Sequence, residues 1–143
     1  MVEYVPNIPI LKPYIDADNK PYWDAVKEQK FVVQQCNKCK NYYHPPRPMC
    51  PECLTLETMK FVPSAGKGVV YSYIIYTTDR MAYPGMKIPY AVMVVEMEEG
   101  VRITANNADD IKPEEVYIGM PVEVTFVKVN DDLTLYQFKK REA

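Results

Sequence analysis

The sequence predicts a mainly β protein, in which an N-terminal helix and a rubredoxin-like zinc ribbon precede a five-stranded OB-fold barrel. Three observations support this fold class. Two Cys-x2-Cys pairs stand in the first half of the chain, five strand-like runs follow them, and a short helical turn separates the third run from the fourth. We expect three units: an extended arm and short helix over 1–30, the zinc ribbon over 31–63 and the barrel over 64–143.

The N-terminal unit begins with prolines interspersed among apolar residues. Because proline disfavours a helix interior, we expect an extended arm over 1–15, which lies in a groove of its own domain or of a partner. A short helix follows over 18–28, with Asp18 or Asn19 as N-cap and Pro21 in the first turn. Three apolar side chains of this helix share its inward face: Tyr22, Trp23 and Val26.

All four cysteines belong to two pairs, Cys36-x2-Cys39 and Cys50-x2-Cys53, with ten residues between the pairs. This spacing is typical of a tetrahedral zinc site, in which thiolates lie about 2.3 Å from the metal. Four cysteine ligands leave no position open for water, so we expect the Zn²⁺ to be structural and not catalytic. His44 lies between the pairs, and we expect it to be an ordinary loop residue.

Two disulfides or a redox pair are the alternative interpretations of the cysteines. Disulfide frameworks are typical of small secreted chains, and the residues after Met1 lack the charged and apolar regions of a signal peptide. A redox pair stands between a strand and a helix, whereas the ten residues after Cys39 include three prolines and predict a tight loop. We therefore expect reduced cysteines and a cytoplasmic protein.

Strand-like runs flank the cysteines and fill the second half of the chain. Two β-prone runs, at 31–35 and 58–62, lead into the first pair and leave the second. Short turn sequences join the second barrel strand to the third and the fourth to the fifth, which implies antiparallel hairpins. A helical turn over 110–117 separates the hairpins in the order of an OB-fold, with an SH3-like or other small barrel as the alternative. The barrel strands are expected at 69–77, 90–97, 101–106, 121–129 and 133–138.

Composition argues against several classes of function. A formal net charge of −2 gives no general attraction to nucleic acid. The longest apolar run, 90–95, is far shorter than the roughly 20 residues that cross a bilayer. A single histidine, with the cysteines assigned to metal, leaves few groups for catalysis, and Gly66-Lys67-Gly68 lacks the Ser or Thr of a P-loop. The sequence thus indicates a protein that is not an enzyme, has no membrane segment and needs no oligomer for stability.

Seven short motifs stand in a specific order along nearly the whole chain. They are Tyr22-Trp23, Gln35-Cys36-x2-Cys39, Tyr43-x-Pro45-Pro46-Arg47-x2-Cys50-Pro51-x-Cys53, Gly66-Lys67-Gly68-Val69-Val70-Tyr71-Ser72-Tyr73, Pro89-Tyr90, Glu98-Glu99-Gly100-Val101-Arg102 and Ile118-Gly119-Met120-Pro121-Val122-Glu123-Val124. In this order the chain resembles the archaeal and bacterial zinc-ribbon plus OB-fold proteins catalogued as domain of unknown function thirty-five. The resemblance implies an acyl-CoA-associated accessory protein, similar to partners of thiolases and hydroxymethylglutaryl-CoA synthase. In such a protein the OB-fold contributes to a CoA site and the chain bridges enzymes.

A site for CoA or acyl-CoA needs cations, backbone donors, an aromatic plane and an apolar channel. Six residues are candidates, with ordinary packing as the alternative for each: Arg47, Gly66, Lys67, Gly68, Tyr71 and Tyr73. The loop after the first barrel strand is long enough to fold over a barrel mouth. Five side chains are expected to line it: Tyr76, Met81, Tyr83, Met86 and Tyr90.

Two other functions compete with an acyl-CoA-binding scaffold for thiolase and hydroxymethylglutaryl-CoA synthase-type enzymes. OB-folds and zinc ribbons also bind single-stranded nucleic acid, through a basic groove and stacked aromatic rings. Twelve tyrosines meet the aromatic requirement, but the acidic chain lacks the basic one. The third function is a partner-binding module without a small ligand, anchored by the N-terminal arm and Trp23.

Overall fold

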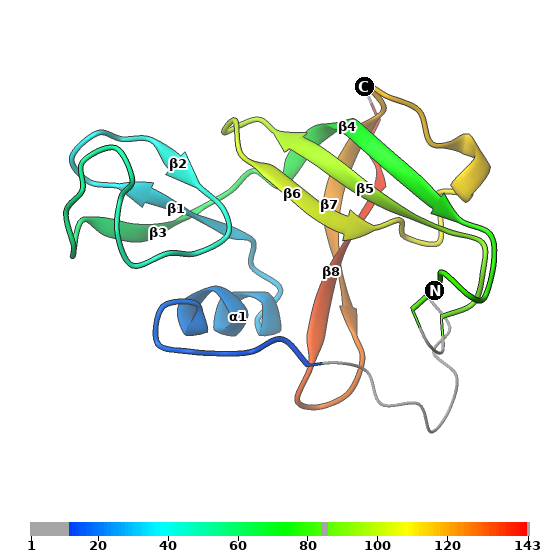
Figure 1. Ribbon diagram of the computed structural model, residues 1–143, viewed down its shortest axis with the longest axis horizontal. Coiled ribbons are helices and arrows are strands. Elements are labelled where there is room, and N and C mark those ends of the chain that lie inside the picture. The colour runs from blue at the N-terminus through cyan, green and yellow to red at the C-terminus, as the bar shows by residue number, and fades with distance from the viewer. Residues whose placement is uncertain (1–11, 84–85, 143) are drawn as a thin grey trace.

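The computed structural model describes residues 12–83 and 86–142 of the chain, so the arm expected over 1–15 lies outside it except for 12–15. The first elements are the helix α1 (Lys20–Lys27) and the strands β1 (Val32–Cys36), β2 (Tyr42–Tyr43) and β3 (Met59–Pro63). The barrel follows with β4 (Lys67–Tyr76), β5 (Tyr90–Met97), β6 (Arg102–Asn106), the 3-10 turn η1 (Pro113–Glu115), β7 (Pro121–Lys128) and β8 (Thr134–Lys140) (Figure 1).

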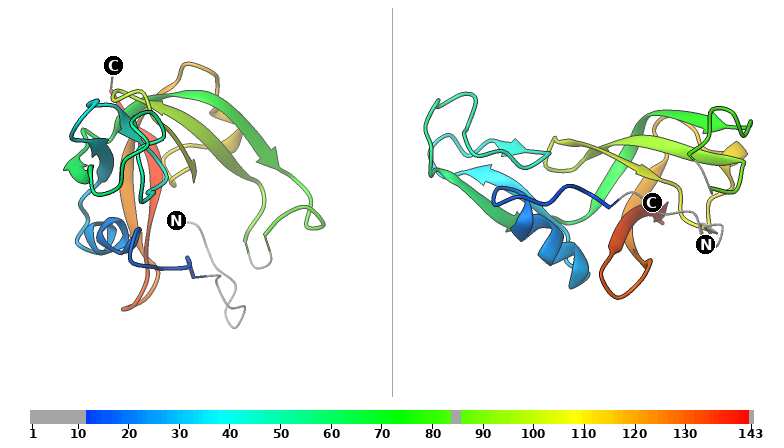
Figure 2. Two further views of the ribbon diagram at one scale, coloured as in Figure 1. Left: turned by 60° about the vertical axis from the view of Figure 1, so that its left-hand side comes forward. Right: turned by 60° about the horizontal axis from the view of Figure 1, so that its bottom comes forward.

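Helix α1 begins after Asn19, one of the two expected caps, and has proline in its first turn. The Asn19 side chain does not cap the helix; it donates to the Tyr14 carbonyl at 2.8 Å and ties the incoming loop instead. Tyr22 and Val26 are buried and Trp23 is half-buried, which confirms the expected inward face. Figures 1 and 2 show α1 beside β8. Within the described residues, no helix is long and apolar enough to span a membrane.

The ribbon is an antiparallel sheet in the order β2-β1-β3. The expectation that the ten residues between the cysteine pairs form only a loop was wrong. Tyr42 and Tyr43 pair with Gln35 and Gln34, because they precede the prolines and keep their backbone N–H groups available. β1 runs away from the barrel and β3 returns to it, so the cysteines lie at the far end of the ribbon (Figure 1).

The second sheet has the antiparallel order β6-β5-β4-β7-β8. An isolated parallel bridge between Asn107 and Phe138 brings its two end strands together, which makes a nearly closed five-stranded barrel of the expected OB-fold type. The strands lie within three residues of their expected bounds. The helical turn expected over 110–117 is shorter, because Lys112 and Val116 have extended backbones on either side of η1.

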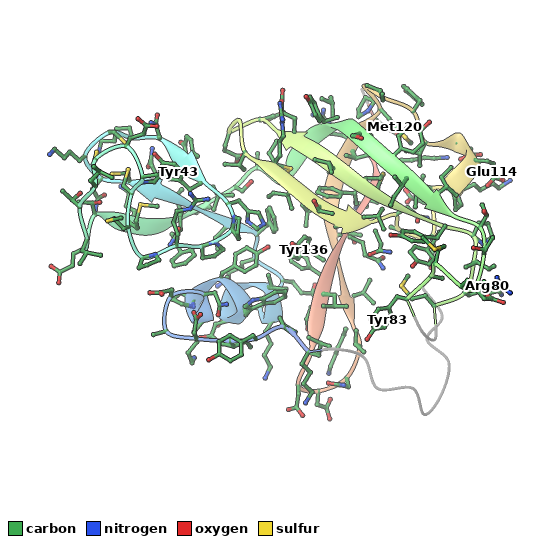
Figure 3. The ribbon with its side chains drawn as sticks, viewed as in Figure 1. Tyr43, Arg80, Tyr83, Glu114, Met120 and Tyr136 are labelled. Carbon is green, nitrogen blue, oxygen red and sulfur yellow. The ribbon has the colours of Figure 1, made fainter. Side chains whose placement is uncertain are left out.

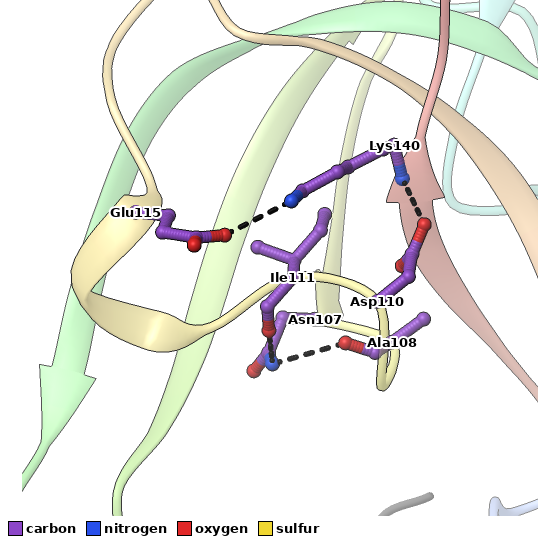
Figure 4. Close-up of polar contacts among 6 residues, drawn as sticks. All are labelled: Asn107, Ala108, Asp110, Ile111, Glu115 and Lys140. Carbon is purple, nitrogen blue, oxygen red and sulfur yellow. Dashed lines mark hydrogen bonds and ion pairs between the residues drawn. The ribbon is translucent and has the colours of Figure 1, made fainter.

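The connection from β6 to β7 is fixed by one buried side chain, that of Asn107 (Figure 4). Its amide oxygen accepts the N–H of Ala91 at 2.8 Å, and its Nδ2 donates to the Ile111 carbonyl at 2.8 Å. Nearby, Asp110 accepts the backbone N–H of Lys140 at 3.0 Å. These bonds attach the connection to both β5 and β8, and so close the barrel on this side.

The helix, the ribbon and the barrel share a single hydrophobic core. Tyr22 and Val26 of α1 pack in it with Phe31 and Val33 of the ribbon. The barrel side chains of this core are Val70, Ala91, Met93, Val95, Met97, Val101, Ile103, Ala105, Ile111, Val116, Met120, Val122 and Phe138. The division of the chain at residues 30 and 63 stays a prediction, and the packing continues across both positions.

Candidate metal centre and binding surfaces

The four cysteine sulfurs form a cluster at the far end of the ribbon, in which all Sγ atoms lie within 4.8 Å of one another. Cys39 and Cys50 are separated by 3.6 Å between their Sγ atoms, and Cys36 and Cys53 by 4.0 Å. A tetrahedral zinc with bonds of about 2.3 Å separates its sulfurs by about 3.8 Å. The cysteines are therefore arranged to bind a metal ion, and their spacing fits zinc.

Two matching turns bring the sulfurs together. Lys40 donates its N–H to the Cys36 carbonyl at 3.0 Å, and Leu54 donates to the Cys50 carbonyl at 2.9 Å. Lys40 and Leu54 both have positive φ values, 66° and 53°. Glycine is the residue that adopts this left-handed conformation freely, whereas another residue pays about 1–2 kcal/mol. Each turn therefore holds a side chain in a strained backbone position directly after a cysteine.

Hydrogen bonds surround the sulfurs. Tyr43 Oη lies 3.3 Å from Cys50 Sγ, and the Cys53 N–H donates to the same sulfur at 3.4 Å. Thr58 Oγ1 lies 3.5 Å from Cys36 Sγ. The bond to Cys50 raises the pKa of the Tyr43 hydroxyl, which keeps its proton. Such donors orient metal-bound thiolates, and the sequence spacing alone did not identify Tyr43 or Thr58 as members of this shell.

The loop between the cysteine pairs holds two of the residues considered above, Arg47 and His44. The backbone of Arg47 is bound on both sides by the buried Gln34 of β1, and its guanidinium lies 5.4 Å from the centre of the Tyr43 ring. His44 packs against Tyr22 of α1, with ring centres 5.5 Å apart. Burial, with a smaller contribution from the Arg47 charge, lowers the pKa of His44 to about 4. The loop histidine is therefore neutral at pH 7 and part of the packing between ribbon and helix.

Gly66, Lys67 and Gly68 join the ribbon to the barrel. Gly66 has a φ of 69°, and its carbonyl accepts the Val124 N–H at 2.7 Å. Gly68 packs so closely against β5 that a Cβ atom there would lie 2.5 Å from the Glu96 carbonyl oxygen. Both glycines are thus required by the path of the chain. Lys67 stands exposed between them.

A bulge in β4 places Tyr71 and Tyr73 on opposite faces of the barrel wall. Val70 pairs with Val95 and Ser72 with Val94, so Tyr71 is an extra residue in the strand. Tyr73 pairs with the buried Met93 and faces the interior. Tyr71 is 48% exposed on the outer face, where the Arg102 guanidinium lies 3.7 Å from its ring centre. Regular alternation would have put both tyrosines on one face.

The six candidate ligand residues are therefore not brought around one space. Arg47 lies on the ribbon, Gly66 to Gly68 at the junction, and Tyr71 and Tyr73 on two faces of β4. Four cavities lined by other described residues contain none of the six. Their role as ligand contacts stays a prediction.

The loop between β4 and β5 does gather its aromatic and methionine side chains. They line an open cavity of about 400 Å³, composed of Tyr76, Met81, Ala82, Tyr83, Met86, Tyr90, Val92 and Asn106. Tyr76 and Tyr90 stack with ring centres 4.9 Å apart, and the Tyr83 N–H donates to Tyr90 Oη at 2.9 Å. Figure 3 labels Tyr83 and Arg80 at this end of the barrel. All five side chains expected to line this loop contribute to the cavity.

A second aromatic cavity lies where α1, the loop between the two cysteine pairs and β8 meet. It has a volume of about 250 Å³ and is lined by Asn19, Tyr22, Trp23, His44, Pro45, Pro46 and Tyr136. Tyr136, labelled in Figure 3, lies between the ribbon, the helix and the barrel, with ring contacts to Tyr22 and Phe31 at 6.1 and 5.5 Å. This meeting point depends on the position of β8, which no local pattern in the sequence indicates.

Comparison with known proteins finds two family models that match this chain. The family model of the ChsH2 rubredoxin-like zinc ribbon domain matches residues 23–57, and that of the ChsH2 C-terminal OB-fold domain matches residues 61–127. A DUF35 domain-containing scaffold protein of Methanocaldococcus jannaschii is 35% identical over 111 residues, which are 77% of this chain and 77% of the relative. The chain belongs to the DUF35 family. A second DUF35 scaffold protein, from Methanothermobacter thermautotrophicus, is 38% identical and is covered over 82% of its length.

Two further matches concern proteins that are named for acyl-CoA or aldolase chemistry. A probable enoyl-CoA hydratase alpha subunit of Thermomonospora curvata is 38% identical over 128 residues, but the DUF35 chain spans only 39% of that relative's length. A solved chain of the Ltp2-ChsH2(DUF35) aldolase superposes with a TM-score of 0.82 at 37% identity. That match covers 90% of the DUF35 chain and 98% of the solved chain.

Proposed function

We propose that this protein is a non-catalytic accessory subunit that binds acyl-CoA enzymes and holds them together. The observation that carries the proposal is the likeness, over nearly the full length of both chains, to a solved chain of the Ltp2-ChsH2(DUF35) aldolase. Curated relatives covered over more than three quarters of their length are named scaffold proteins, which agrees with this role. Its partners are a thiolase-type and a hydroxymethylglutaryl-CoA synthase-type enzyme, and it works in the cytoplasm, where thiolates stay reduced.

The outer face of β4 supports an enzyme-binding role. Val69, Tyr71 and Ile74 are 37%, 48% and 54% exposed. The loop before β7 adds Tyr117 and Ile118, which are 55% and 70% exposed. The Gly119 N–H donates to the Val70 carbonyl at 2.7 Å and fixes this loop against β4. Apolar surface of this kind, held on a rigid sheet, is typical of a protein–protein interface.

The side chains of the chain support a non-catalytic role. Its single histidine is neutral and packed against α1, where burial lowers its pKa to about 4. We propose that Cys36, Cys39, Cys50 and Cys53 hold one structural zinc, as their Sγ spacing of 3.6–4.0 Å fits four thiolates on one ion. A metal so ligated has no open position for substrate.

The cavity beneath the β4–β5 loop is the place we propose for the pantetheine arm or acyl group of CoA. Its volume of about 400 Å³ is within the range of small-molecule sites but is small for a whole CoA. Met81 is 73% exposed at its rim. A cavity this open suits a site that the bound enzyme completes, with cations such as Arg47 and Lys67 available for phosphates.

The test is reconstitution of the purified protein with a thiolase-type and a synthase-type acyl-CoA enzyme of the same organism. Size-exclusion chromatography with light scattering measures assembly, and calorimetry measures CoA binding to the assembly. We expect a complex that contains both enzymes, and at least tenfold weaker CoA binding after Met81→Glu. Tyr14→Glu, at a position that is 84% exposed and lies outside this cavity, is the matched control and should leave CoA binding unchanged.

Two results would overturn the proposal. One is the absence of any complex with either enzyme at micromolar concentrations. The other is preferential binding of single-stranded nucleic acid whose affinity falls steeply with salt, because that salt dependence is the signature of phosphate contacts. In the second case the protein would be a nucleic-acid-binding module.

A further inference from the structure

We propose that the second cysteine turn of the ribbon is a docking knob, whose Leu54 inserts into an apolar pocket with a basic rim on the partner enzyme. This inference rests on the proposed function, since it assigns a second contact to the same partner enzymes. We define the docking knob as residues 49–57, the segment that carries Cys50, Cys53 and the apolar side chains between and after them.

Three large apolar side chains project from the docking knob. Leu54 is 71% exposed, Leu56 65% and Met49 39%. Met49 and Leu56 pair in an isolated antiparallel bridge, which brings the two ends of the segment together. Single exposed leucines are common on protein surfaces, but a group of three on one short loop indicates a binding surface.

Folding does not explain Leu54. Its φ of 53° is a conformation that glycine adopts more easily, and its exposed side chain gains almost no burial in return. Lys40 occupies the equivalent position of the first turn, with a φ of 66°. The Lys40 side chain is charged and is favourably solvated when exposed. The leucine at position 54 therefore has a role outside the folded chain.

The docking knob is held rigidly. The Leu54 N–H donates to the Cys50 carbonyl at 2.9 Å, and the Cys50 N–H to the Thr55 carbonyl at 3.4 Å. The Asn37 N–H of the first turn donates at 2.7 Å to the carbonyl of Thr58, the residue directly after the docking knob. Leu54 directly follows a cysteine of the metal cluster. A side chain on so fixed a backbone loses little conformational entropy on binding.

Charge distinguishes the two cysteine turns and gives the chemistry of the partner surface. The docking knob contains Glu52 and Glu57, both exposed, and no lysine or arginine. The first turn, 37–41, contains Lys38 and Lys40 and no acid. An apolar tip with an acidic rim is complementary to an apolar pocket bordered by lysine or arginine. The occupant is therefore the partner enzyme and not a second copy of the chain.

The position of the docking knob allows this contact. The cysteine turns lie at the end of the ribbon that points away from the barrel (Figure 1), and the right-hand view of Figure 2 also shows the ribbon loops clear of the barrel. The outer face of β4 is part of the barrel. The ribbon tip and the barrel face are thus separate surfaces, as a protein that contacts large enzymes through two places requires.

The experiment compares Leu54→Gly with Lys40→Gly in the zinc-loaded, full-length protein. Both replacements relieve the same left-handed position, so both should retain stoichiometric zinc and equal or higher stability. We expect Leu54→Gly to weaken binding of the thiolase-type enzyme at least tenfold, as measured by calorimetry, and Lys40→Gly to change it by less than twofold. Leu56→Ser, at a position without positive φ, should also weaken binding. Glu52→Lys should slow association at low salt.

Each outcome decides one statement. If the wild type binds the enzyme and Leu54→Gly binds it equally well, the assignment of the docking knob as a contact is wrong while the proposed function stands. If the wild type binds no acyl-CoA enzyme, the proposed function fails and the docking knob fails with it. A wild-type dimer that Leu54→Gly converts to a monomer, seen by analytical ultracentrifugation, would assign the knob to a second copy and overturn the inference.

Discussion

Gln34 and Arg47 are joined by a reciprocal pair of hydrogen bonds. The Arg47 N–H donates to Gln34 Oε1 at 2.8 Å, and Gln34 Nε2 donates to the Arg47 carbonyl at 3.1 Å. Gln34 is only 3% exposed, so its side-chain amide replaces the water that the Arg47 backbone would otherwise bind. One side chain of β1 thereby fixes a loop that has few backbone partners of its own because of its prolines.

Replacement of Gln34 by leucine should destabilise the protein by about 1–3 kcal/mol, because both backbone groups of Arg47 lose their partner in a buried place. Chemical denaturation measures this change in the free energy of unfolding. Gln35→Leu is the matched control on the same strand: Gln35 donates one bond, to the exposed Lys40 carbonyl at 3.1 Å, and should cost less. Equal effects of the two replacements would contradict the importance of the buried pair.

Removal of the metal should unfold the ribbon. Structural zinc contributes on the order of 10–16 kcal/mol to the folding of small zinc modules, so Cys36→Ser should lose zinc, as measured by elemental analysis. The barrel should melt at a lower temperature, because Phe31 and Val33 belong to the common core. Lys38→Ser, at an exposed position in the same turn, should leave both properties unchanged. Stoichiometric zinc and unchanged stability in Cys36→Ser would contradict the structural assignment.

His44 should make stability depend on pH. Burial lowers its pKa to about 4 in the folded protein, whereas the unfolded chain titrates near 6.5. Between these values the unfolded state binds more protons, so this stability is present above pH 6.5 and is lost as the pH falls towards 4. The total effect is at most about 3 kcal/mol. His44→Gln should flatten the stability profile from pH 7 to 5, measured with excess zinc, and an unchanged slope would refute this account.

Gly68→Ala should destabilise the barrel by about 1–3 kcal/mol, because the added Cβ meets the Glu96 carbonyl oxygen at 2.5 Å and a methyl group of Val95 at 2.7 Å. Gly119→Ala separates this steric effect from backbone strain. Gly119 has a φ of 90° but nothing within 4 Å of a Cβ atom, so its replacement should cost only about 1–2 kcal/mol. Thermal unfolding measures both losses of stability. A clearly larger loss for Gly119→Ala than for Gly68→Ala would contradict this account and show that β4 and β5 adjust to the added methyl group.

The sequence predicted the elements whose signal is long or local. The run at 90–97 matches β5 residue for residue, since a nearly continuous apolar run of this length between turn signals is typical of a buried strand and is short for a helix. The cysteine cluster was predictable for a different reason: each turn is short, and only the meeting of two turns depends on the fold. The gathering of side chains around the β4–β5 loop, which includes Tyr76 and Tyr90, was also predictable, because a hairpin connection brings the ends of its two strands together.

Other features leave no periodic signal. β2 has two residues, and the bulge at Tyr71 adds only one residue to β4. Even so, that one residue moves Tyr71 and Tyr73 to opposite faces, which is why the candidate ligand residues do not converge. The contact between Tyr22 and Tyr136 depends on how the barrel closes. Barrel closure is decided by packing between residues that are distant in sequence, so no local pattern near Tyr22 indicates it.

The contact between α1 and β8 also constrains the order in which the protein can form. Tyr22 leaves the ribosome well before Tyr136, and about 110 residues of chain separate the two rings. Until β8 is made, the inner face of α1 packs against β1 but lacks its contact with Tyr136, and the barrel has neither its last strand nor the bridge from Asn107 to Phe138. Contacts between residues so distant in sequence slow folding. A nascent chain that carries a finished ribbon would therefore still expose the sides of Tyr22 and Trp23 that contact Tyr136, and synthesis would be the stage at which this protein most needs a chaperone.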